Sequence, residues 1–284
     1  MEKSNSATKL SRRMKKNNSF CVCPLASGSK GNSLLVSTPD TAILVDAGLS
    51  GVELQRRMAA VGQDPADLSA IVITHEHIDH VRGAGVLSRR FNIPVYISSA
   101  THQACTGLGH ISALTYFDCG NRFKIQDLTV NPFSISHDAS DPAGLTVTWQ
   151  QRKIGIATDL GVVTNLVRTH LSGSDVLYLE SNHDPEMLIN GSYPWHLKQR
   201  IQSRTGHLSN SDAGTLLADL YHDQLHHVIL AHLSEENNRP ERALAEVGRC
   251  LNRPGIALCV AGPDRPGDVI RITGEENQND KTDR

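Results

Sequence analysis

The segment from 68 to 80 combines an apolar run with a high density of metal-binding side chains. Leu-Ser-Ala-Ile-Val-Ile at 68–73 is followed directly by Thr74-His75-Glu76-His77-Ile78-Asp79-His80. Burying so many polar groups at the end of a strand costs free energy unless they have a function there. Imidazole and carboxylate groups are ligands of divalent cations. In an extended turn His75 and His77 point the same way, and the following bend can bring Asp79 and His80 to a neighbouring point. The segment predicts two adjacent metal positions, which we favour over a histidine-rich surface loop because such a loop rarely follows a fully apolar strand.

Three later residues repeat the pattern of a polar side chain placed after an apolar strand. His137 follows residues 130–136, Asp159 follows 154–158, and His232 follows 228–231. A single histidine of this kind is more often structural than a ligand. A two-metal site, however, needs about four protein ligands per ion, some of them shared, and a carboxylate such as Asp159 can bridge two cations. Together with the first segment, these residues predict the rest of a dinuclear site.

The elements that position these residues can be predicted from apolar spacing and capping residues. Short apolar runs predict strands at 20–26, 33–37, 42–46, 70–74, 94–97, 128–133, 144–149, 153–157, 175–180, 227–232 and 256–260. Helical spacing and capping boxes predict helices at about 51–61, 83–90, 161–171, 209–220 and from about 240 onward. Many strands before and between helices favour an α+β fold in which sheets pack face to face with helices outside.

Length and composition are those of a globular protein. The chain has 284 residues, of which 39% are hydrophobic and 20% charged, and its net charge of -2 excludes a polycation built to coat nucleic acid. Residues 1–18 carry six basic side chains and one acidic side chain without apolar periodicity, so we expect a disordered basic tail there. We expect a single domain over 19–273 and a disordered acidic tail over 274–284.

The sequence predicts a cytoplasmic protein with no membrane partner. No run approaches the ~18 apolar residues of a membrane span. The apolar stretch at 20–26 is short for a signal peptide and contains a proline. The six cysteines form no Cys-x-x-Cys pair, so reduced thiols in a cytosol are the simplest interpretation.

The motifs, taken in chain order, resemble those of a known family. The Thr-His-x-His-x-Asp-His pattern with His137, Asp159 and His232 is similar to the metallo-β-lactamase superfamily, and further motifs resemble its bacterial YycJ/WalJ branch. These motifs are Ala26-Ser27-Gly28-Ser29-Lys30-Gly31-Asn32-Ser33, Asp46-Ala47-Gly48-Leu49-Ser50, Ile135-Ser136-His137-Asp138-Ala139, Ile156-Ala157-Thr158-Asp159-Leu160-Gly161, Glu180-Ser181-Asn182-His183-Asp184, Gly206-His207-Leu208-Ser209-Asn210 and Leu230-Ala231-His232-Leu233-Ser234-Glu235-Glu236-Asn237-Asn238. The resemblance covers residues 20–262 and implies an αββα sandwich of two mixed β-sheets with a dinuclear metal site. It also implies a DNA exonuclease acting 5′ to 3′, since members of that branch are described as DNA exonucleases.

The resemblance assigns the ligands to two divalent ions, for which zinc or manganese is expected and iron also suits the donors. The first ion would be held by His75, His77 and His137, the second by Asp79, His80 and His232, and Asp159 would bridge them. Asp79 is expected to take part in catalysis as well as in metal binding.

A catalytic pair and substrate contacts are also expected. Glu180 and His207 are spaced like the pair of ribonuclease Z relatives, in which a histidine outside the metal shell protonates the leaving oxygen and a glutamate orients it. The glycine-rich turn 27–33 could present backbone N–H groups to a phosphate. Residues 193–200 mix aromatic and basic groups, as strand-binding grooves do, although Tyr193 and Trp195 could equally be core. The expected substrate-binding residues are Ser27, Ser29, Asn32, Ser209, Ser234, Lys198 and Arg200.

Two other functions stay open on the residues alone. One is a small-molecule hydrolase that uses the same site on a thioester, a lactone or a cyclic phosphate. The other is a non-catalytic regulator, which the complete ligand set disfavours. The sequence alone does not choose among the metals, between DNA and RNA, or among oligomeric states.

Overall fold

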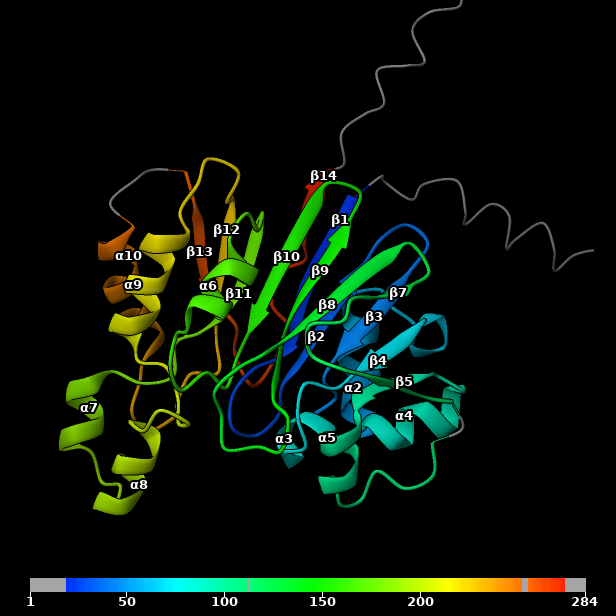
Figure 1. Cartoon of the computed structure of the whole chain (residues 1–284), viewed down its shortest axis with the longest axis horizontal. Coiled ribbons are helices and arrows are strands. Elements are labelled where there is room, and N and C mark those ends of the chain that lie inside the picture. The colour runs from blue at the N-terminus through cyan, green and yellow to red at the C-terminus, as the bar shows by residue number, and fades with distance from the viewer. Residues whose placement is uncertain (1–18, 112, 252–254, 274–284) are drawn as a thin grey trace, which may run out of the picture.

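The computed structural model describes residues 19–111, 113–251 and 255–273, and within these residues the strands form two mixed sheets of seven strands each (Figure 1). The first sheet has the strand order β14-β1-β2-β3-β4-β5-β6. Its strands are β1 (Ser19–Ala26), β2 (Ser33–Ser37), β3 (Ala42–Val45), β4 (Ala70–Val72), β5 (Val95–Ser98), β6 (Leu114–Phe117) and β14 (Ile270–Thr273). The second sheet has the order β13-β12-β11-β10-β9-β8-β7. Its strands are β7 (Phe123–Ile125), β8 (Leu128–Ser134), β9 (Ala143–Trp149), β10 (Arg152–Ala157), β11 (Val176–Glu180), β12 (His227–Ala231) and β13 (Ala257–Val260).

The helices lie on the outer faces of the two sheets. The first sheet is covered by α2 (Gly51–Ala60), α4 (Ala84–Phe91) and α5 (Ser99–Ala104), and the second by α6 (Asn165–Leu171), α9 (Asn210–Leu220) and α10 (Pro240–Cys250) (Figure 1). The shorter elements are η2 (Pro65–Asp67), α3 (Ile78–Val81), α7 (Pro185–Asn190) and α8 (Trp195–Ile201). This is the four-layer αββα sandwich that the sequence predicts.

Strand alternation explains why the strands are apolar on both faces. On β3, Ile43 and Val45 point into the core between the sheets, whereas Leu44 between them packs under the outer helices. On β10, Ile154 and Ile156 likewise join the core between the sheets. A strand that is buried on both faces has a continuous apolar sequence. These strands can therefore be predicted from the sequence.

All eleven predicted strands are confirmed to within a residue or two at each end. The five predicted helices are also present, although the third was predicted too early: it begins at Asn165, where the Thr164 side chain accepts a hydrogen bond from the backbone N–H of Val167. The predictions missed β6, β7 and β14 and the short helices α3, α5, α7 and α8. The two predicted tails lie outside the described residues.

The capping box predicted for α2 is only half formed. The Ser50 side chain accepts from the backbone N–H of Glu53, as predicted. The Glu53 carboxylate turns instead to Arg56 and Arg57. Arg57 in turn donates to the backbone oxygens of Leu25 and Pro263, and so ties α2 to the first sheet.

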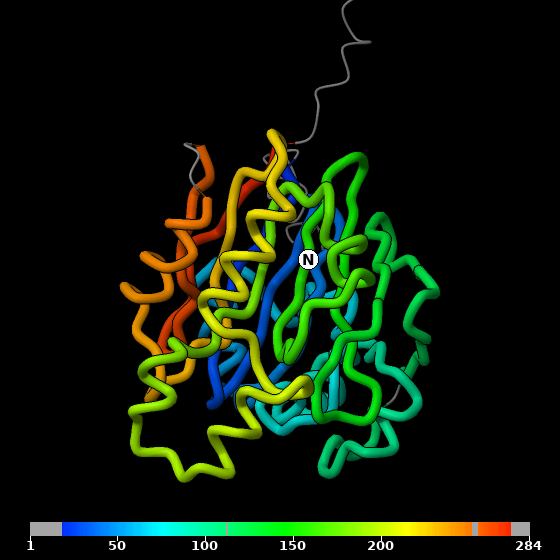
Figure 2. Tube along the Cα trace, turned by 60° about the vertical axis from the view of Figure 1, so that its left-hand side comes forward, coloured from blue at the N-terminus to red at the C-terminus, as the bar shows by residue number. Residues whose placement is uncertain are grey.

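The topology brings the carboxyl ends of many strands to one edge of the sandwich. Strand β3 runs parallel to β4 in the first sheet, and β10, β11 and β12 run parallel to one another in the second. Their carboxyl ends lie at the lower end of the molecule in Figure 1, where α3 is found. At the opposite end β1 begins and β14 finishes, with Ser19 paired to Thr273. The segment with α7 and α8 projects at the end where α3 lies (Figures 1 and 2).

None of the helices in the described part of the chain combines the length and apolar character needed to cross a bilayer. The six cysteines are all free thiols.

Candidate metal centre and active site

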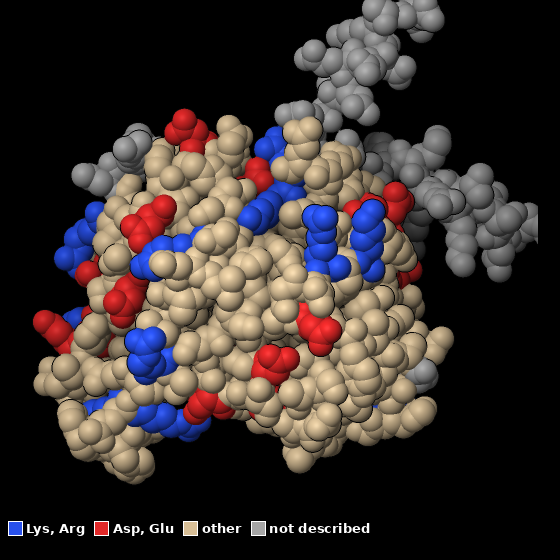
Figure 3. Space-filling view, in the orientation of Figure 1, with Lys and Arg blue, Asp and Glu red and all other residues tan. Residues whose placement is uncertain are grey.

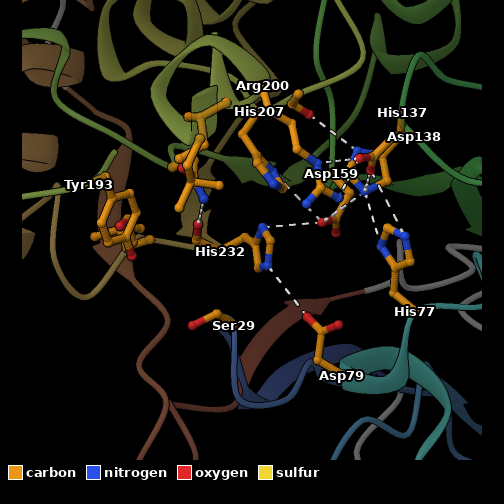
Figure 4. A pocket seen from close by; sticks show the side chains of 16 residues that line it. Ser29, His77, Asp79, His137, Asp138, Asp159, Tyr193, Arg200, His207 and His232 are labelled. Carbon is orange, nitrogen blue, oxygen red and sulfur yellow. Dashed lines mark hydrogen bonds and ion pairs between the residues drawn. The ribbon is translucent and has the colours of Figure 1, made fainter. Parts of the chain in front are cut away.

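Five of the seven predicted metal ligands lie just beyond the end of a strand at this common edge, and the other two lie in a short helix. His75 and His77 follow β4, His137 follows β8, Asp159 follows β10 and His232 follows β12, while Asp79 and His80 lie in α3. These side chains converge on one cavity (Figure 4). Ligands in open sheets bind outside the carboxyl ends of strands for the same topological reason.

Three ring nitrogens form the first cluster. His77 Nδ1 lies 3.2 Å from His75 Nε2 and 3.3 Å from His137 Nε2. Zinc–nitrogen bonds of about 2.0–2.1 Å in tetrahedral geometry place neighbouring nitrogens about 3.3 Å apart. His77 Nδ1 therefore already has the spacing from both other nitrogens that a tetrahedral cation requires, and all three lie within 4.8 Å of one another.

The second cluster contains Asp79, His80 and His232. Asp79 Oδ2 lies 3.6 Å from His80 Nε2 and 3.7 Å from His232 Nε2. Asp159 lies between the two clusters, with Oδ2 3.2 Å from His80 Nε2 and Oδ1 3.6 Å from His137 Nε2. Each oxygen of this carboxylate faces a different cluster, which suits a bridging ligand.

The other ring nitrogen of four of these histidines is held by a fixed partner. These contacts are His75 Nδ1 with Thr74 Oγ1 at 3.0 Å, His80 Nδ1 with Asp46 Oδ2 at 2.8 Å, His137 Nδ1 with the Gly206 carbonyl at 3.2 Å, and His232 Nδ1 with Glu180 Oε1 at 2.9 Å. Such partners fix the ring orientation of metal-binding histidines and leave the opposite nitrogen for the cation. Consistent with this, His232 Nε2 is buried and has no hydrogen-bond partner among the described residues. The donor set fits divalent metal ions.

The electrostatics of the cluster favour a cation. Burial lowers the pKa of His75 well below its usual value, so this ring stays neutral, as a ligand must. Burial acts in the same direction on His232, but the negative charge of Asp159 and the nearby carboxylates of Asp79 and Glu180 outweigh it and raise the pKa to about 10. The negative field that favours a proton at His232 also attracts a divalent ion.

Asp46 supports the site but was given no role from the sequence, although its motif was noted. Its carboxylate accepts hydrogen bonds from the backbone N–H and the hydroxyl of Thr74 and contacts His80. Asp46, Asp159 and His232 have φ of 59°, 58° and 55°, in the left-handed region that non-glycine residues seldom occupy. Such strained residues cluster at functional sites.

Gly48 lets the loop that holds Asp79 come close. A β-carbon at position 48 would lie 1.6 Å from the Asp79 carbonyl oxygen, so only glycine fits. The Asn32 backbone N–H donates to that same oxygen at 2.7 Å.

Glu180 connects the predicted acid His207 to the metal cluster. Its Oε1 contacts Nδ1 of His207 at 2.8 Å and Nδ1 of His232 at 2.9 Å. Its Oε2 accepts from the backbone N–H groups of Leu160 and Leu208. Burial opposes ionisation of this carboxyl, but the His207 charge and the hydrogen bonds from both histidines lower its pKa to about 2. For His207, burial lowers the pKa and Glu180 more than offsets this, so the pKa is raised.

The cavity has a volume of about 270 Å³ and opens beside these groups. The predicted residues Ser29, Arg200, Ser234 and His207 line it. Arg200 donates from Nε to Asp138 Oδ2 at 2.7 Å. Asp138, which the sequence predictions overlooked, also lies 3.4 Å from His137 Nε2.

Four residues that the sequence predicts to bind substrate have their polar side-chain atoms in contact with other groups of the protein. Lys198 is 9% exposed, and its ammonium donates to the Ile189 and Gly191 carbonyls at 2.7 Å. The Ser209 hydroxyl caps α9. Ser27 Oγ accepts from the His232 backbone N–H at 2.7 Å, and Asn32 Nδ2 donates to Asp79 Oδ2 at 3.1 Å. The polar atoms of these side chains contact other groups of the protein. We therefore expect the four residues to support the structure around the site.

Comparisons with known proteins agree with this architecture. A family model described as a Beta-lactamase superfamily domain matches residues 41–232. The chain is 40% identical over 237 residues to exodeoxyribonuclease YycJ of Bacillus anthracis, which covers 82% of this chain and 90% of that protein. It is 39% identical over 224 residues to exodeoxyribonuclease WalJ of Streptococcus pneumoniae, with 77% and 83% covered.

Solved structures show the same fold at low sequence identity. The metallo-β-lactamase fold protein YhfI from Bacillus subtilis superposes with a TM-score of 0.70 at 17% identity, covering 90% of this chain and all of that one. The short form of human tRNase Z gives a TM-score of 0.60 at 17% identity, covering 87% and 98%.

The chain therefore belongs to the metallo-β-lactamase superfamily, whose fold implies divalent metal ions, and it is a hydrolase of that fold. Within the superfamily it falls in the YycJ/WalJ branch, as its identity with both proteins over most of their length shows.

Proposed function

We propose that this protein is a dinuclear metal-dependent phosphodiesterase that degrades DNA as a 5′ to 3′ exonuclease in the cytoplasm. The observation that carries the proposal is the His207–Glu180 contact at 2.8 Å beside the two ligand clusters. A phosphodiester has a poor alkoxide leaving group, so a proton donor placed next to the metal site is useful for this reaction. The relationship to the two exodeoxyribonucleases supports DNA as the substrate.

We assign His75, His77 and His137 to one ion, Asp79, His80 and His232 to the other, and Asp159 to both. Zinc or manganese suits these donors, and iron is compatible with them. When bound, such ions supply hydroxide at neutral pH and stabilise the charge that develops on the phosphoryl oxygens.

The chain itself orients the substrate and moves the proton. His207 donates its proton to the leaving oxygen, and Glu180 holds the imidazole in position and stabilises its charged form. Arg200, with a side chain that is 64% exposed at the rim of the cavity, is placed to contact a backbone phosphate. Ser29 and Ser234 line the same cavity and offer further hydrogen bonds.

Surface charge supports binding at the cavity rather than along a broad face. On the face drawn in Figure 3, basic and acidic side chains of the described residues are interspersed. Proteins that hold nucleic acid chiefly by its backbone carry a clustered basic surface instead. Recognition of a strand end within the cavity fits the charge on this face better than wrapping of a duplex across it.

The proposal is tested with purified protein and 5′- or 3′-labelled DNA and RNA, with zinc and manganese varied. We expect degradation of DNA from the 5′ end and no hydrolysis of lactones or thioesters. Hydrolysis of a lactone or thioester without action on DNA would favour a small-molecule hydrolase. Metal binding without hydrolysis of any of these would favour a regulator.

A further inference from the structure

Apolar side chains line the cavity together with the predicted metal ligands. They are Tyr193, Leu197 and Ile201, from α8 and the turn before it, and Leu233. Of the three apolar cores formed by the described residues, none includes Tyr193, Leu197 or Ile201. These three side chains line the cavity outside the cores, and Leu233 lines it while also packing against the third core. Together the four residues form a wall, here called the α8 wall, for a ligand that has an apolar surface.

The α8 wall is held rigidly. Lys198 fastens α8 to the end of α7 through the two carbonyl contacts described above. The backbone N–H of His207 donates to the Ile201 carbonyl at 2.9 Å. A β-carbon at position 206 would lie 2.1 Å from that same oxygen, so the close approach requires Gly206. A preorganised wall binds its ligand without the cost of ordering a loop.

The order of groups along the cavity relates the wall to the reaction. His77 lies at one end and Tyr193 at the other, with His207 and His232 between them (Figure 4). His207 thus lies nearer Tyr193 than His77 does, so a group that leaves with its proton can reach the α8 wall.

We propose that the α8 wall binds the nucleoside on the leaving-group side of the scissile phosphodiester, with Tyr193 stacking on its base. This inference rests on the proposed nuclease function. Hydroxide forms a new bond to phosphorus, the P–O3′ bond breaks, and O3′ takes the proton from His207. Stacking on an aromatic side chain tolerates every base, as an exonuclease without sequence preference requires.

The size of the cavity links this subsite to strand polarity. Its volume of about 270 Å³ is just below the range of about 300–1,000 Å³ usual for ligand sites. A single nucleotide is of that size, so we expect the cavity to hold one nucleotide at a time. The nucleoside that leaves through O3′ is then the 5′-terminal one, so the enzyme releases 5′-mononucleotides and advances in the 5′ to 3′ direction.

Ligand binding tests the subsite without relying on catalysis. Calorimetry on the metal-loaded protein should show that thymidine 3′-monophosphate binds more tightly than thymidine 5′-monophosphate. Tyr193→Ala should weaken binding of the 3′-monophosphate by roughly 5- to 150-fold, the contribution of one base stacked on an aromatic ring, and should leave inorganic phosphate binding unchanged. Tyr193→Phe should retain the wild-type affinity. Trp195→Ala is the matched control, because Trp195 is 63% exposed and does not line the cavity.

Degradation of DNA separates this inference from the nuclease proposal. On 5′-labelled DNA we expect Tyr193→Ala to lose activity, and we expect it to match the wild type when the 5′-terminal nucleotide is abasic. If the wild type prefers the 3′-monophosphate but degrades no DNA, the nuclease function is wrong and the nucleoside site stands. If the wild type degrades DNA and Tyr193→Ala binds and degrades as the wild type does, the α8 wall is not the nucleoside site.

Discussion

Substitution of Glu180 tests most directly how the predicted acid and the metal ligands depend on each other. Its two carboxylate oxygens take part in four hydrogen bonds, two with histidines and two with backbone N–H groups. Glu180→Gln keeps one acceptor oxygen, so two of the four contacts must be lost or reversed. Hydrogen bonds to a charged group contribute about 1.5–3 kcal/mol each, so the free energy of unfolding should fall by about 3–6 kcal/mol.

The substitution also changes which ring nitrogen of His232 carries a proton. If the new amide nitrogen donates to His232 Nδ1, the ring proton must move to Nε2, the atom that faces Asp79 in the second cluster. A protonated nitrogen cannot bind a cation. Removing such an orienting partner costs about 10–100-fold in metal affinity or activity. The same change at His207 would leave its ring neutral with the proton on Nε2, and a neutral imidazole is a far weaker acid than the charged form. The variant should therefore lose metal affinity and acid strength together.

Competition with a chromogenic chelator measures this effect. We expect Glu180→Gln to bind zinc about 10–100-fold more weakly than the wild type and to be slow on both DNA and bis(p-nitrophenyl) phosphate. Glu76→Gln is the control: Glu76 lies between two metal ligands, but its Oε1 accepts from the backbone N–H and hydroxyl of Ser140. Unchanged zinc affinity in Glu180→Gln would refute the role of Glu180 in orienting His232.

Three further predictions concern individual residues. Elemental analysis should find about two divalent ions per chain, and Asp159→Ala should lose at least one of them because its two oxygens face both clusters; metal-free protein that zinc and manganese cannot activate would contradict this. His207→Ala should keep its metals while its rate on DNA falls by roughly 10²–10⁴, with a much smaller loss on bis(p-nitrophenyl) phosphate, whose leaving group hardly needs a proton; equal losses on both would mean that His207 is a ligand or a structural residue. Lys198→Met should speed hydrogen exchange across 185–201 without changing metal content, since it removes two contacts to carbonyl oxygens; unchanged exchange would mean that these contacts do not hold α8.

The sequence predicts those site residues that can bind a metal and that also lie at the end of a recognisable strand. His137, Asp159 and His232 could be found because each follows a strand that is apolar enough to recognise. The role of Lys198 could not be predicted in the same way. The sequence around a lysine beside aromatic residues does not show whether its ammonium contacts a phosphate or two carbonyl oxygens. Asp46 follows a predicted strand too, but its role depends on His80, 34 positions later, and only the fold brings them together.

The missed strands share a different cause. The strand β14 is four residues long, and its partner β1 lies at the other end of the chain. Local spacing carries little information about such a pairing. The short helices α7 and α8 were missed because six or seven residues give too few turns for a periodic pattern.

The pairing of Ser19 with Thr273 has a consequence for how the protein is made. Strand β1 is translated before every other strand of the two sheets, yet its neighbour on one side, β14, is translated after all of them. Until then, β1 is an open strand edge with unpaired backbone groups, which readily pair with other chains. Synthesis at about 5–20 residues per second leaves that edge unprotected for roughly ten seconds or more. A nascent chain of this protein is therefore a natural client for a chaperone that covers exposed strands, and a truncation before residue 270 should aggregate rather than fold.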